Sequence, residues 1–300
     1  MKVLLIGGTG FFGKSFLDSF SRGLLLKFQI TEIIILSRST NRFYISYPEF
    51  ISPQITYVKG DITTIDFLPE ADIVIHAATS TKQIDYKLNP KGEKRNIELG
   101  STNYIELAKK LHKNAKIVYC SSGAVYGKQP IEVKKMSEDF PFQDINELAL
   151  EKRDYAFGKR NAEEQIKELG KFGIKVAIAR CFAFYGDYLP KDGHFAYSSF
   201  LNSAEQGKDI RVNATHEVIR SYMHADELVE NLIKIANQAS PECPIYNVGS
   251  DEEISIFELA KKISKKHNVK VIKKNQIDLT KIDRYVPNID KLRKLNLTKN

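Results

Sequence analysis

The chain has 300 residues, of which 42% are hydrophobic and 27% are charged, a composition that excludes a disordered or fibrous protein. This length supports one large domain or two coupled ones. The net charge of +8 suits a dinucleotide or a sugar diphosphate as well as nucleic acid. Because the basic residues are scattered along the chain, we expect no nucleic-acid partner.

The three cysteines, Cys120, Cys181 and Cys243, are odd in number and far apart. They exclude a disulfide framework, and no two of them have the spacing of metal ligands. The apolar run at residues 3–6 is too short for the core of a signal peptide or for a membrane span. We therefore expect a cytoplasmic protein with no metal and no membrane partner.

The first half of the chain alternates short runs rich in Val and Ile with longer segments of helical periodicity. Strands are predicted at residues 2–6, 32–36, 55–58, 72–76, 116–120 and 175–179, and helices at 11–25, 96–112 and 155–169. Continuous apolar strands between helices are typical of a parallel sheet buried on both faces. The pattern predicts an α/β fold with a Rossmann-type doubly wound sheet.

The composition changes after residue 180. Residues 185–197 are rich in Gly, Asp, Pro and Tyr, and further helices are predicted at 198–206, 226–238 and 256–266, with a strand near 245–248. We expect a dinucleotide-binding domain at residues 1–180, completed by residues 224–250. The rest of residues 181–300 would form a smaller mixed substrate-binding lobe that is not an independent domain.

A glycine-rich turn lies between the first predicted strand and the first predicted helix. Glycines let a backbone turn sharply and approach a pyrophosphate, while a helix N-terminus offers free N–H groups to phosphates. The alternative is a glycine-rich turn that binds no ligand. We expect the following residues to contact the cofactor: Gly7, Gly10, Phe11, Phe12 and Gly13.

The end of the second strand bears on the choice between NAD and NADP. A site for NAD usually has a carboxylate at this place, which accepts hydrogen bonds from the adenosine ribose. Here Ser37 is followed by Arg38, and a guanidinium can pair with the 2′-phosphate of NADP. The sequence favours NADP over NAD, although Arg38 in a solvated loop or stacked on the adenine is the alternative.

Two later segments are further candidates for cofactor binding. Asp61 and Ile62 follow the third strand, where an acidic side chain can accept a hydrogen bond from the adenine amine. The alternative for Asp61 is a helix N-cap. Ala77 and Ala78 follow the fourth strand, and their small side chains would let the backbone pass close to the cofactor.

A tyrosine and a lysine four residues apart form the catalytic candidate. Tyr155 and Lys159 share one helix face. A nearby ammonium, together with the positive nicotinamide ring, lowers the pKa of a phenol, which can then exchange a proton with a sugar hydroxyl. Ser122 ends the preceding strand, where its hydroxyl can bind the same oxygen. A surface Tyr–Lys pair is the alternative.

Seven segments in this order make the chain resemble the extended short-chain dehydrogenase/reductases, specifically the nucleotide-sugar epimerase/dehydratase group. They are GGTGFFG, HAA, SSGAVYG, YAFGK, RCFAFYG, RSYMHADEL and YNVGS. The resemblance implies that Ser122 is the catalytic hydroxyl, Tyr155 the acid/base and Lys159 its tuner and ribose ligand. It also implies a nucleotide-diphosphate sugar as substrate, a homodimer built on a four-helix bundle, and a role in surface polysaccharide synthesis.

The resemblance also implies two substrate contacts. Arg220 matches an arginine that grips the substrate diphosphate, the alternative being an exposed charge after a turn. His194 lies where related enzymes contact the substrate, and in GDP-fucose synthase a histidine at the matching place is an acid for epimerisation. The cysteine that accompanies it would correspond to Gly123 here. His194 is therefore a lone acid/base, a hydrogen-bond donor or a helix cap.

Departures from the family pattern narrow the choice of reaction. The 4,6-dehydratases carry an Asp–Glu pair directly after the catalytic hydroxyl, whereas this chain has Gly123 and Ala124, which cannot move protons. Ala183 stands where many relatives have an asparagine that contacts substrate. Ala183 indicates an altered sugar pocket, while Gly123 and Ala124 disfavour a 4,6-dehydratase and leave a 4-epimerase or a 4-ketoreductase. The alternative is a non-catalytic dinucleotide sensor or scaffold, although such proteins usually lose the Tyr–Lys pair.

Overall fold

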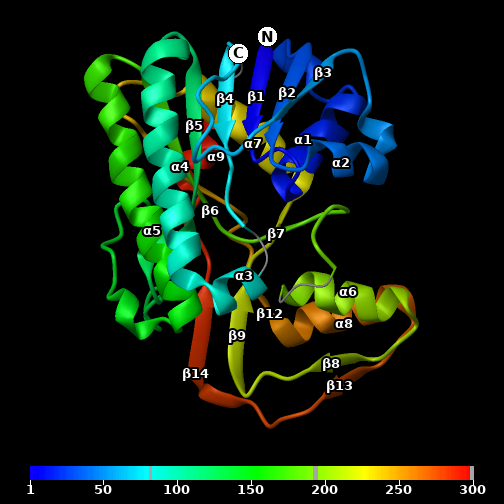
Figure 1. Ribbon diagram of the computed structural model, residues 1–300. Helices are drawn as coiled ribbons and strands as arrows, with labels where there is room; N and C mark the ends of the chain where they lie inside the picture. Colours follow the sequence, from blue (N-terminus) through cyan, green and yellow to red (C-terminus); the bar gives the residue numbers. More distant parts are fainter. Residues whose placement is uncertain (81–82, 192–194, 298–300) are drawn as a thin grey trace.

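The protein is built around one parallel sheet with helices on both faces, and its strands run toward a smaller lobe, which lies at the bottom of Figure 1. The computed structural model describes residues 1–80, 83–191 and 195–297. His194 therefore lies outside the described residues.

Seven strands form the main sheet in the order β11-β6-β5-β4-β1-β2-β3, and every neighbouring pair is parallel. The chain winds outward from β1 in one direction and then from β4 in the other, so the topological switch point lies between β1 and β4. The strand bounds are Lys2–Ile6 for β1, Glu32–Ser37 for β2, Ile55–Lys59 for β3, Ile73–His76 for β4, Lys116–Ser122 for β5, Lys175–Cys181 for β6 and Ile245–Val248 for β11.

Helices cover both faces of this sheet because its strands are apolar on both sides. Along β1, Val3 and Leu5 enter one core, while Leu4 and Ile6 enter the other. The first core is covered by α1 (Phe11–Ser21), α2 (Thr40–Ser46), α7 (Ala225–Asn237) and α9 (Asp290–Leu297). The second is covered by α4 (Pro90–Leu111) and α5 (Leu150–Lys167), which lie side by side in Figure 1.

The smaller lobe packs two short sheets around α6 (Ala196–Glu205) and α8 (Ile256–His267), while a further sheet of two short strands packs against α7. In the largest, β9 pairs antiparallel with β12 and parallel with β14, so the lobe is mixed. The remaining bounds are α3 Gln83–Leu88, β7 Phe184–Tyr185, β8 Ile210–Val212, β9 His216–Arg220, β10 Met223–His224, β12 Ile254–Ser255, β13 Val271–Lys273 and β14 Asp278–Tyr285.

The predicted Rossmann-type sheet and smaller mixed lobe are confirmed, but several helix bounds were wrong. The helix predicted at residues 11–25 ends at Ser21, and Gly23 follows at a φ of +74°. The helix predicted from residue 96 begins at Pro90, because the Asn89 side chain caps it by accepting from the Gly92 N–H at 3.0 Å. The helix predicted from residue 155 begins at Leu150, so Tyr155 lies inside it rather than at its start.

The strands of the smaller lobe were missed by the sequence analysis. β14 reads DLTKIDRY, and its residues are partly buried or exposed rather than alternating between apolar and polar. A strand that pairs with only one neighbour at the edge of a small sheet has no need of a continuous apolar face. Its position became visible only through its pairing with β9.

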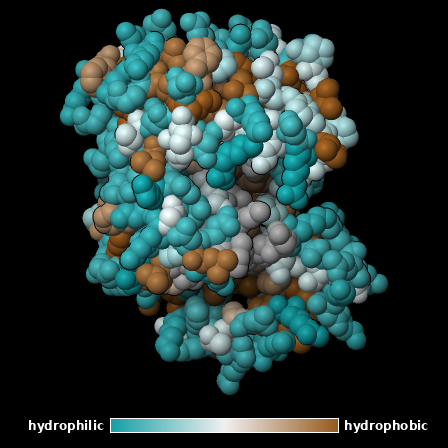
Figure 2. Space-filling view, viewed as in Figure 1, coloured by the Kyte–Doolittle hydropathy of each residue, from teal (hydrophilic) through white to brown (hydrophobic). Residues whose placement is uncertain are grey.

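The surface is mainly hydrophilic in the view of Figure 2, where hydrophobic residues form small separate patches over the main body. Within residues 1–80, 83–191 and 195–297, no helix is both long and apolar enough to cross a lipid bilayer.

A buried ion pair joins α5 to the main sheet. The Arg180 guanidinium on β6 donates to the Glu163 carboxylate, with its shortest N–O distance at 2.8 Å. The same carboxylate accepts from the Ser121 hydroxyl at 2.5 Å, and Arg180 also donates to the Tyr126 hydroxyl at 3.0 Å. Both charges are almost fully shielded from water, and each is therefore stabilised mainly by the other.

We predict that Glu163→Gln lowers the free energy of unfolding by about 3 kcal/mol, because it leaves the Arg180 guanidinium buried without a counter-charge. Urea denaturation measures this value. The matched control is Glu164→Gln, which breaks only an exposed pair with Lys167 and should change stability by less than about 0.5 kcal/mol. Equal effects of the two substitutions would contradict the assignment.

Candidate active site

The glycine-rich loop leaves the amino end of α1 open. The helix begins after Gly10, and no side chain caps its first turn. The N–H groups of Gly7 and Gly8 both donate to the Leu36 carbonyl oxygen, at 3.1 and 3.2 Å, which fixes the loop against β2. An uncapped helix N-terminus has free N–H donors and the positive end of the helix dipole, as a pyrophosphate requires.

The close packing of this loop explains two of its glycines. Gly7 has a φ of +86°, and a Cβ built on it would lie 2.7 Å from the Ala78 Cα. A Cβ on Gly13 would lie 1.9 Å from the Gly8 carbonyl oxygen. Ala77 and Ala78 therefore lie against the loop, and their expected place beside the cofactor stays a prediction. At Gly10, by contrast, a Cβ would meet only the Gly7 oxygen at 3.5 Å.

The two phenylalanines of the loop are packed inside the protein. Phe11 is buried in the first core, the one that Val3 and Leu5 of β1 enter. The ring of Phe12 packs edge-on against Phe184 with centroids 5.4 Å apart. Both side chains are therefore engaged in packing, and the expected contact of these two residues with the cofactor stays a prediction.

The residues expected to contact the adenosine end form a small polar cluster. The hydroxyls of Ser37 and Thr9 share a hydrogen bond of 2.7 Å. Arg38 is largely exposed, and its guanidinium lies 3.8 Å from the Asp61 carboxylate. Asp61 also accepts from the N–H and the hydroxyl of Thr63, at 2.9 and 2.8 Å. This capping-type turn agrees with the alternative that we kept for Asp61, while the neighbouring Ile62 is buried in the second core.

The structure brings the two expected catalytic hydroxyls together. Ser122 ends β5, and its Oγ accepts from the Ala124 N–H at 3.1 Å. The Tyr155 phenol on α5 lies beside the Ser122 side chain. Burial raises the pKa of Tyr155 to about 12, and the nearby Ser122 hydroxyl opposes this rise because it stabilises the phenolate.

Lys159 lies one turn beyond Tyr155 on α5 and is only 1% exposed. Its Nζ donates to the Cys120 carbonyl oxygen at 2.8 Å and to the Tyr119 hydroxyl at 3.4 Å. Burial lowers the pKa of Lys159 to about 8. These contacts anchor the ammonium beside the strand that ends in Ser122.

A second tyrosine at this place was missed by the sequence analysis. Tyr285 is the last residue of β14, and a Cβ built on Gly123, the neighbour of Ser122, would lie 2.6 Å from its hydroxyl oxygen. Its ring lies against Phe182 with centroids 4.7 Å apart. No motif marked Tyr285, because only the return of the chain through the smaller lobe brings it to β5.

Arg220, the residue expected to grip a diphosphate, has an acidic partner. Its guanidinium donates to both carboxylate oxygens of Asp283, at 2.8 and 3.3 Å, and to the Asp283 carbonyl oxygen at 2.8 Å. Arg220 on β9 is the register partner of Tyr285 on β14. A diphosphate would therefore share this guanidinium with Asp283.

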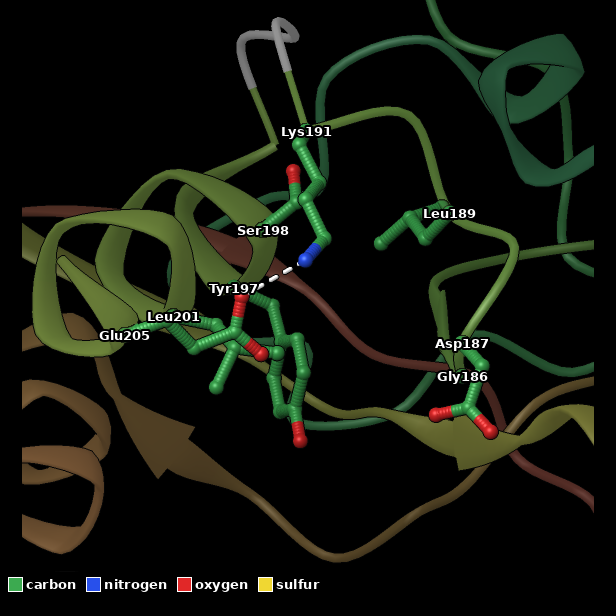
Figure 3. A pocket seen from close by; sticks show the side chains of 8 residues that line it. All are labelled: Gly186, Asp187, Leu189, Lys191, Tyr197, Ser198, Leu201 and Glu205. Atoms are coloured by element: carbon green, nitrogen blue, oxygen red, sulfur yellow. Dashed lines mark hydrogen bonds and ion pairs between the residues drawn. The ribbon is translucent and has the colours of Figure 1, made fainter. Parts of the chain in front are cut away.

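A hollow of about 280 Å³ opens beside α6. Figure 3 shows Lys191 and Glu205 paired across one side of it, at 2.6 Å, with the Tyr197 ring along its wall. Neither Ser122 nor Tyr155 lines it. Residues on both sides of the segment that contains His194 contribute to this hollow, but the expected role of His194 falls outside the described residues.

The cysteine thiols are buried and the side chains that could bind a metal are dispersed in the part of the chain that the structure describes. No cluster of three or more His, Cys, Asp or Glu side chains has the arrangement of a metal site there. Cys120, Cys181 and Cys243 are all buried and free. Burial raises the pKa of Cys181 well above its usual value, so its thiol stays protonated and unreactive.

We predict that two glycine substitutions in the loop affect different properties, one the stability and the other the binding of NAD. Gly13→Ala should prevent α1 from packing and lower the melting temperature, because its Cβ collides with the Gly8 carbonyl. Gly10→Ala should leave the melting temperature unchanged but weaken NAD binding at least about tenfold, a loss of about 1.4 kcal/mol. Thermal unfolding and titration calorimetry measure the two effects. Undiminished NAD binding by Gly10→Ala would show that the pyrophosphate lies elsewhere.

We also predict that the buried ammonium destabilises the folded state near neutral pH. The unfolded chain keeps the ordinary lysine pKa of 10.5, whereas burial lowers the folded value to about 8. The unfolded chain therefore binds more protons between pH 8 and 10.5, and this contribution to stability rises with pH in that window. At pH 7 the penalty is at most about 3 kcal/mol.

Lys159→Met should consequently be more stable than the native protein at pH 7, with a difference that shrinks toward pH 10. Urea denaturation at several pH values measures this difference. Lys152→Met, at an exposed position of the same helix, is the matched control and should change stability by less than about 0.5 kcal/mol at every pH. A loss of stability in Lys159→Met at pH 7 would contradict the prediction.

Comparisons with known proteins agree with this geometry. UDP-glucuronic acid decarboxylase 6 of Arabidopsis thaliana is 29% identical over 273 residues, which cover 88% of this chain and 73% of that protein. The structure of UDP-N-acetylglucosamine 4-epimerase from Methanobrevibacter ruminantium M1 has a TM-score of 0.80 at 19% identity, covering 100% of this chain and 93% of the other.

A third comparison includes a bound dinucleotide. DesIV, a dTDP-glucose 4,6-dehydratase from Streptomyces venezuelae solved with NAD and TYD bound, has a TM-score of 0.79 at 20% identity. The match covers 100% of this chain and 92% of that one. Residues 3–249 match the sequence model of the NAD dependent epimerase/dehydratase family. This span contains the glycine-rich loop and both expected catalytic residues of α5, and the chain belongs to that family.

Proposed function

We propose that this protein transfers hydride between C4 of a nucleotide-diphosphate sugar and a nicotinamide dinucleotide, as a 4-epimerase or a 4-ketoreductase. The observation that carries the proposal is that the Tyr155 phenol lies beside the Ser122 side chain, with Lys159 one turn beyond Tyr155 on the same helix. A setting in the synthesis of surface polysaccharide precursors agrees with the substrates of related proteins. A non-catalytic sensor would have no use for this buried and energetically costly set of groups.

The dinucleotide, when bound along the loop before α1, supplies a nicotinamide ring that accepts and returns hydride. Tyr155 takes the proton from the C4 hydroxyl during oxidation and gives it back during reduction. Ser122 holds the same oxygen by a hydrogen bond. Lys159 stabilises the phenolate form of Tyr155 and binds the ribose of the dinucleotide. Arg220 pairs with the sugar diphosphate.

The dinucleotide is proposed to be NADP or NAD. The family and the DesIV structure associate the fold with NAD. Arg38 favours NADP, because its guanidinium is largely exposed and lies beside Ser37. Its ion pair with the Asp61 carboxylate is loose, with an N–O distance of 3.8 Å. Little energy is lost when such an exposed pair gives way to a 2′-phosphate.

Decarboxylation of a UDP-uronic acid is a second candidate, favoured by the similarity to a UDP-glucuronic acid decarboxylase. Oxidation at C4 turns a uronic acid into a β-keto acid, which loses carbon dioxide without a base that removes the C5 hydrogen. The absence of acidic side chains at Gly123 and Ala124 is compatible with this reaction and with C4 epimerisation. It disfavours the elimination of water that a 4,6-dehydratase performs.

A homodimer is also proposed. Leu99 on α4 and Phe157 on α5 are partly exposed, at 42% and 40%, although both are large and hydrophobic. The two helices pack closely together, and their outer faces are available for a four-helix bundle with a second copy.

The proposed chemistry predicts that Tyr155→Phe lowers kcat at least about 100-fold while NAD binding is retained, because only the acid/base group is removed. The assay supplies UDP-glucose, UDP-glucuronic acid or dTDP-glucose and follows the reduced dinucleotide by absorbance and the sugar by NMR. Tyr44→Phe, which lies beside Tyr57 and outside the site, is the control and should keep full activity. If Tyr155→Phe turned over as fast as the native protein, the catalytic assignment would be wrong.

The same preparation identifies the cofactor and the reaction class. Freshly purified protein is denatured, and any released dinucleotide is identified by chromatography. Stoichiometric NAD supports an epimerase or decarboxylase cycle, in which the hydride returns to the sugar. An empty protein that binds NADPH reversibly supports a 4-ketoreductase.

A further inference from the structure

Arg220 ends β9, next to the strand β14 that returns from the smaller lobe toward the main sheet (Figure 1). Its register partner on β14 is Tyr285. A Cβ built on Gly123, which directly follows Ser122, would lie 2.6 Å from the Tyr285 hydroxyl oxygen. Arg220 is therefore one strand away from a residue that reaches the carboxyl end of β5, where the sugar is proposed to react.

One end of the Arg220 guanidinium makes all the hydrogen bonds that this side chain has in the described part of the chain. Nη1 donates to the Ile219 carbonyl oxygen at 2.8 Å, and to the carbonyl oxygen and the carboxylate of Asp283 at 2.8 and 3.3 Å. Nη2 donates to the second carboxylate oxygen of Asp283 at 2.8 Å. The carboxylate thus lies against the outer edge of the guanidinium, the edge formed by Nη1 and Nη2.

The other edge of this guanidinium, formed by Nε and Nη2, has donors to spare. A guanidinium has five N–H groups in one fixed plane. Among the described residues, Nε has no hydrogen-bond acceptor and Nη2 has one, so the Nε hydrogen and one Nη2 hydrogen remain. These two hydrogens are nearly parallel, the geometry in which two oxygens of a phosphate accept. The Arg220 side chain is 20% exposed, so a ligand can reach this Nε edge.

The Asp283 carboxylate decides how the guanidinium plane is turned. The backbone carbonyls of Ile219 and Asp283 accept from Nη1 only. Nη2 is held by the Asp283 carboxylate alone. Without this carboxylate, the plane could turn, because a long arginine side chain has many rotamers. Asp283 therefore orders the guanidinium before a ligand arrives, and this lowers the entropy that is lost on binding.

The charge of Asp283 also determines what Arg220 can bind. The carboxylate balances the charge of the guanidinium, so the pair attracts a distant anion only weakly. A ligand gains affinity mainly by forming both short hydrogen bonds with the Nε edge, which requires two oxygens at the right spacing. Because Arg220 lies near the place where the sugar is proposed to react, the matching group is the phosphate bonded to the sugar.

We propose that Asp283 is a positioning residue for substrate binding: it holds the outer edge of the Arg220 guanidinium so that the Nε edge receives two oxygens of the phosphate bonded to the sugar. This inference rests on the proposed function, because it takes a nucleotide-diphosphate sugar as the ligand. Asp283 acts only through Arg220 and touches no ligand itself.

The direct test is Asp283→Ala, measured by titration calorimetry with UDP, dTDP and GDP and with the matching monophosphates. A monophosphate lacks the phosphate that Arg220 is proposed to hold. For the diphosphate that the native protein binds most tightly, we expect Kd to rise about tenfold, because two charge-assisted hydrogen bonds lose their preset geometry. For its monophosphate we expect a change of less than about twofold, because that ligand does not meet Arg220.

Asp278→Ala is the matched control, because Asp278 lies on the same strand and pairs with Lys281 at 3.4 Å. It should bind both nucleotides as the native protein does. If the Asp283 carboxylate instead competes with the ligand for Arg220, Asp283→Ala binds the diphosphate more tightly. If Asp283 only stabilises the fold, the affinities for diphosphate and monophosphate fall alike, or neither changes. Each of these results would overturn the proposal, and circular dichroism checks that the variants are folded.

A second variant shows whether Asp283 acts through Arg220. Arg220→Lys keeps the positive charge and loses the planar edge with two donors. In that background, Asp283→Ala should weaken diphosphate binding no further, because no guanidinium plane is left to orient. An equal loss from Asp283→Ala in both backgrounds would show that the two residues act separately and would contradict the proposal.

Nucleotide binding needs no turnover, so this experiment separates the inference from the proposed function. If diphosphate binding depends on Asp283 as described but no nucleotide sugar exchanges hydride, the proposed function fails and the inference stands. If the native protein binds none of the three diphosphates, the inference is wrong even where a sugar substrate is turned over.

Discussion

The buried pair of Glu163 and Arg180 is the interaction on which the arrangement of the site depends. Glu163 lies one turn beyond Lys159 on α5, and its carboxylate accepts from Arg180 on β6 and from Ser121 on β5. It therefore joins the helix that carries Tyr155 to the strand that ends in Ser122. A buried pair of this kind gives little net stability, but it strongly penalises any displacement of one partner. That penalty suits a site in which two hydroxyls must stay within hydrogen-bonding reach.

The same network extends to the return of the chain from the smaller lobe. Arg180 donates to the Tyr126 hydroxyl, which in turn donates to the Asn247 side chain at 2.8 Å. Asn247 on β11 also donates to the carbonyl oxygens of Met136 and Asn288. The loop after Ser122, the last strand of the sheet and the segment after Tyr285 therefore meet at one amide. This explains how a residue late in the sequence can be placed accurately over β5.

Burial shifts the pKa values of the groups in this site in opposite directions. It lowers the pKa of Lys159 and raises those of Tyr155 and Tyr285, so each group is held toward its neutral form. The Ser122 hydroxyl acts against burial for both phenols, because it stabilises their charged form. The site is thus poised so that an added positive charge, as in an oxidised nicotinamide, favours the phenolate of Tyr155. Such pairs of buried groups are typical of acid–base catalysis.

Much of the fold followed from local patterns. Apolar runs marked the strands of the main sheet, because a parallel sheet buried on both faces needs continuous hydrophobic side chains. The bounds were less accurate where capping decided them, as at Asn89 before α4. The edge strand β14 has no apolar alternation, and for that reason the pattern did not reveal it. The loop glycines and the Tyr155–Lys159 spacing were visible because the chemistry of each depends on residues close in sequence.

The sequence by itself determined the fold class, the family and the identity of the local motifs, because periodicity and short spacings are properties of neighbouring residues. Only the tertiary structure placed Asp283 on Arg220 and the Tyr285 hydroxyl in the space above Gly123. These contacts join segments far apart in the chain, and their geometry depends on how the smaller lobe packs against the sheet. The absence of a side chain at Gly123 looked like a missing function in the sequence. In the folded protein it is the space that a distant tyrosine occupies.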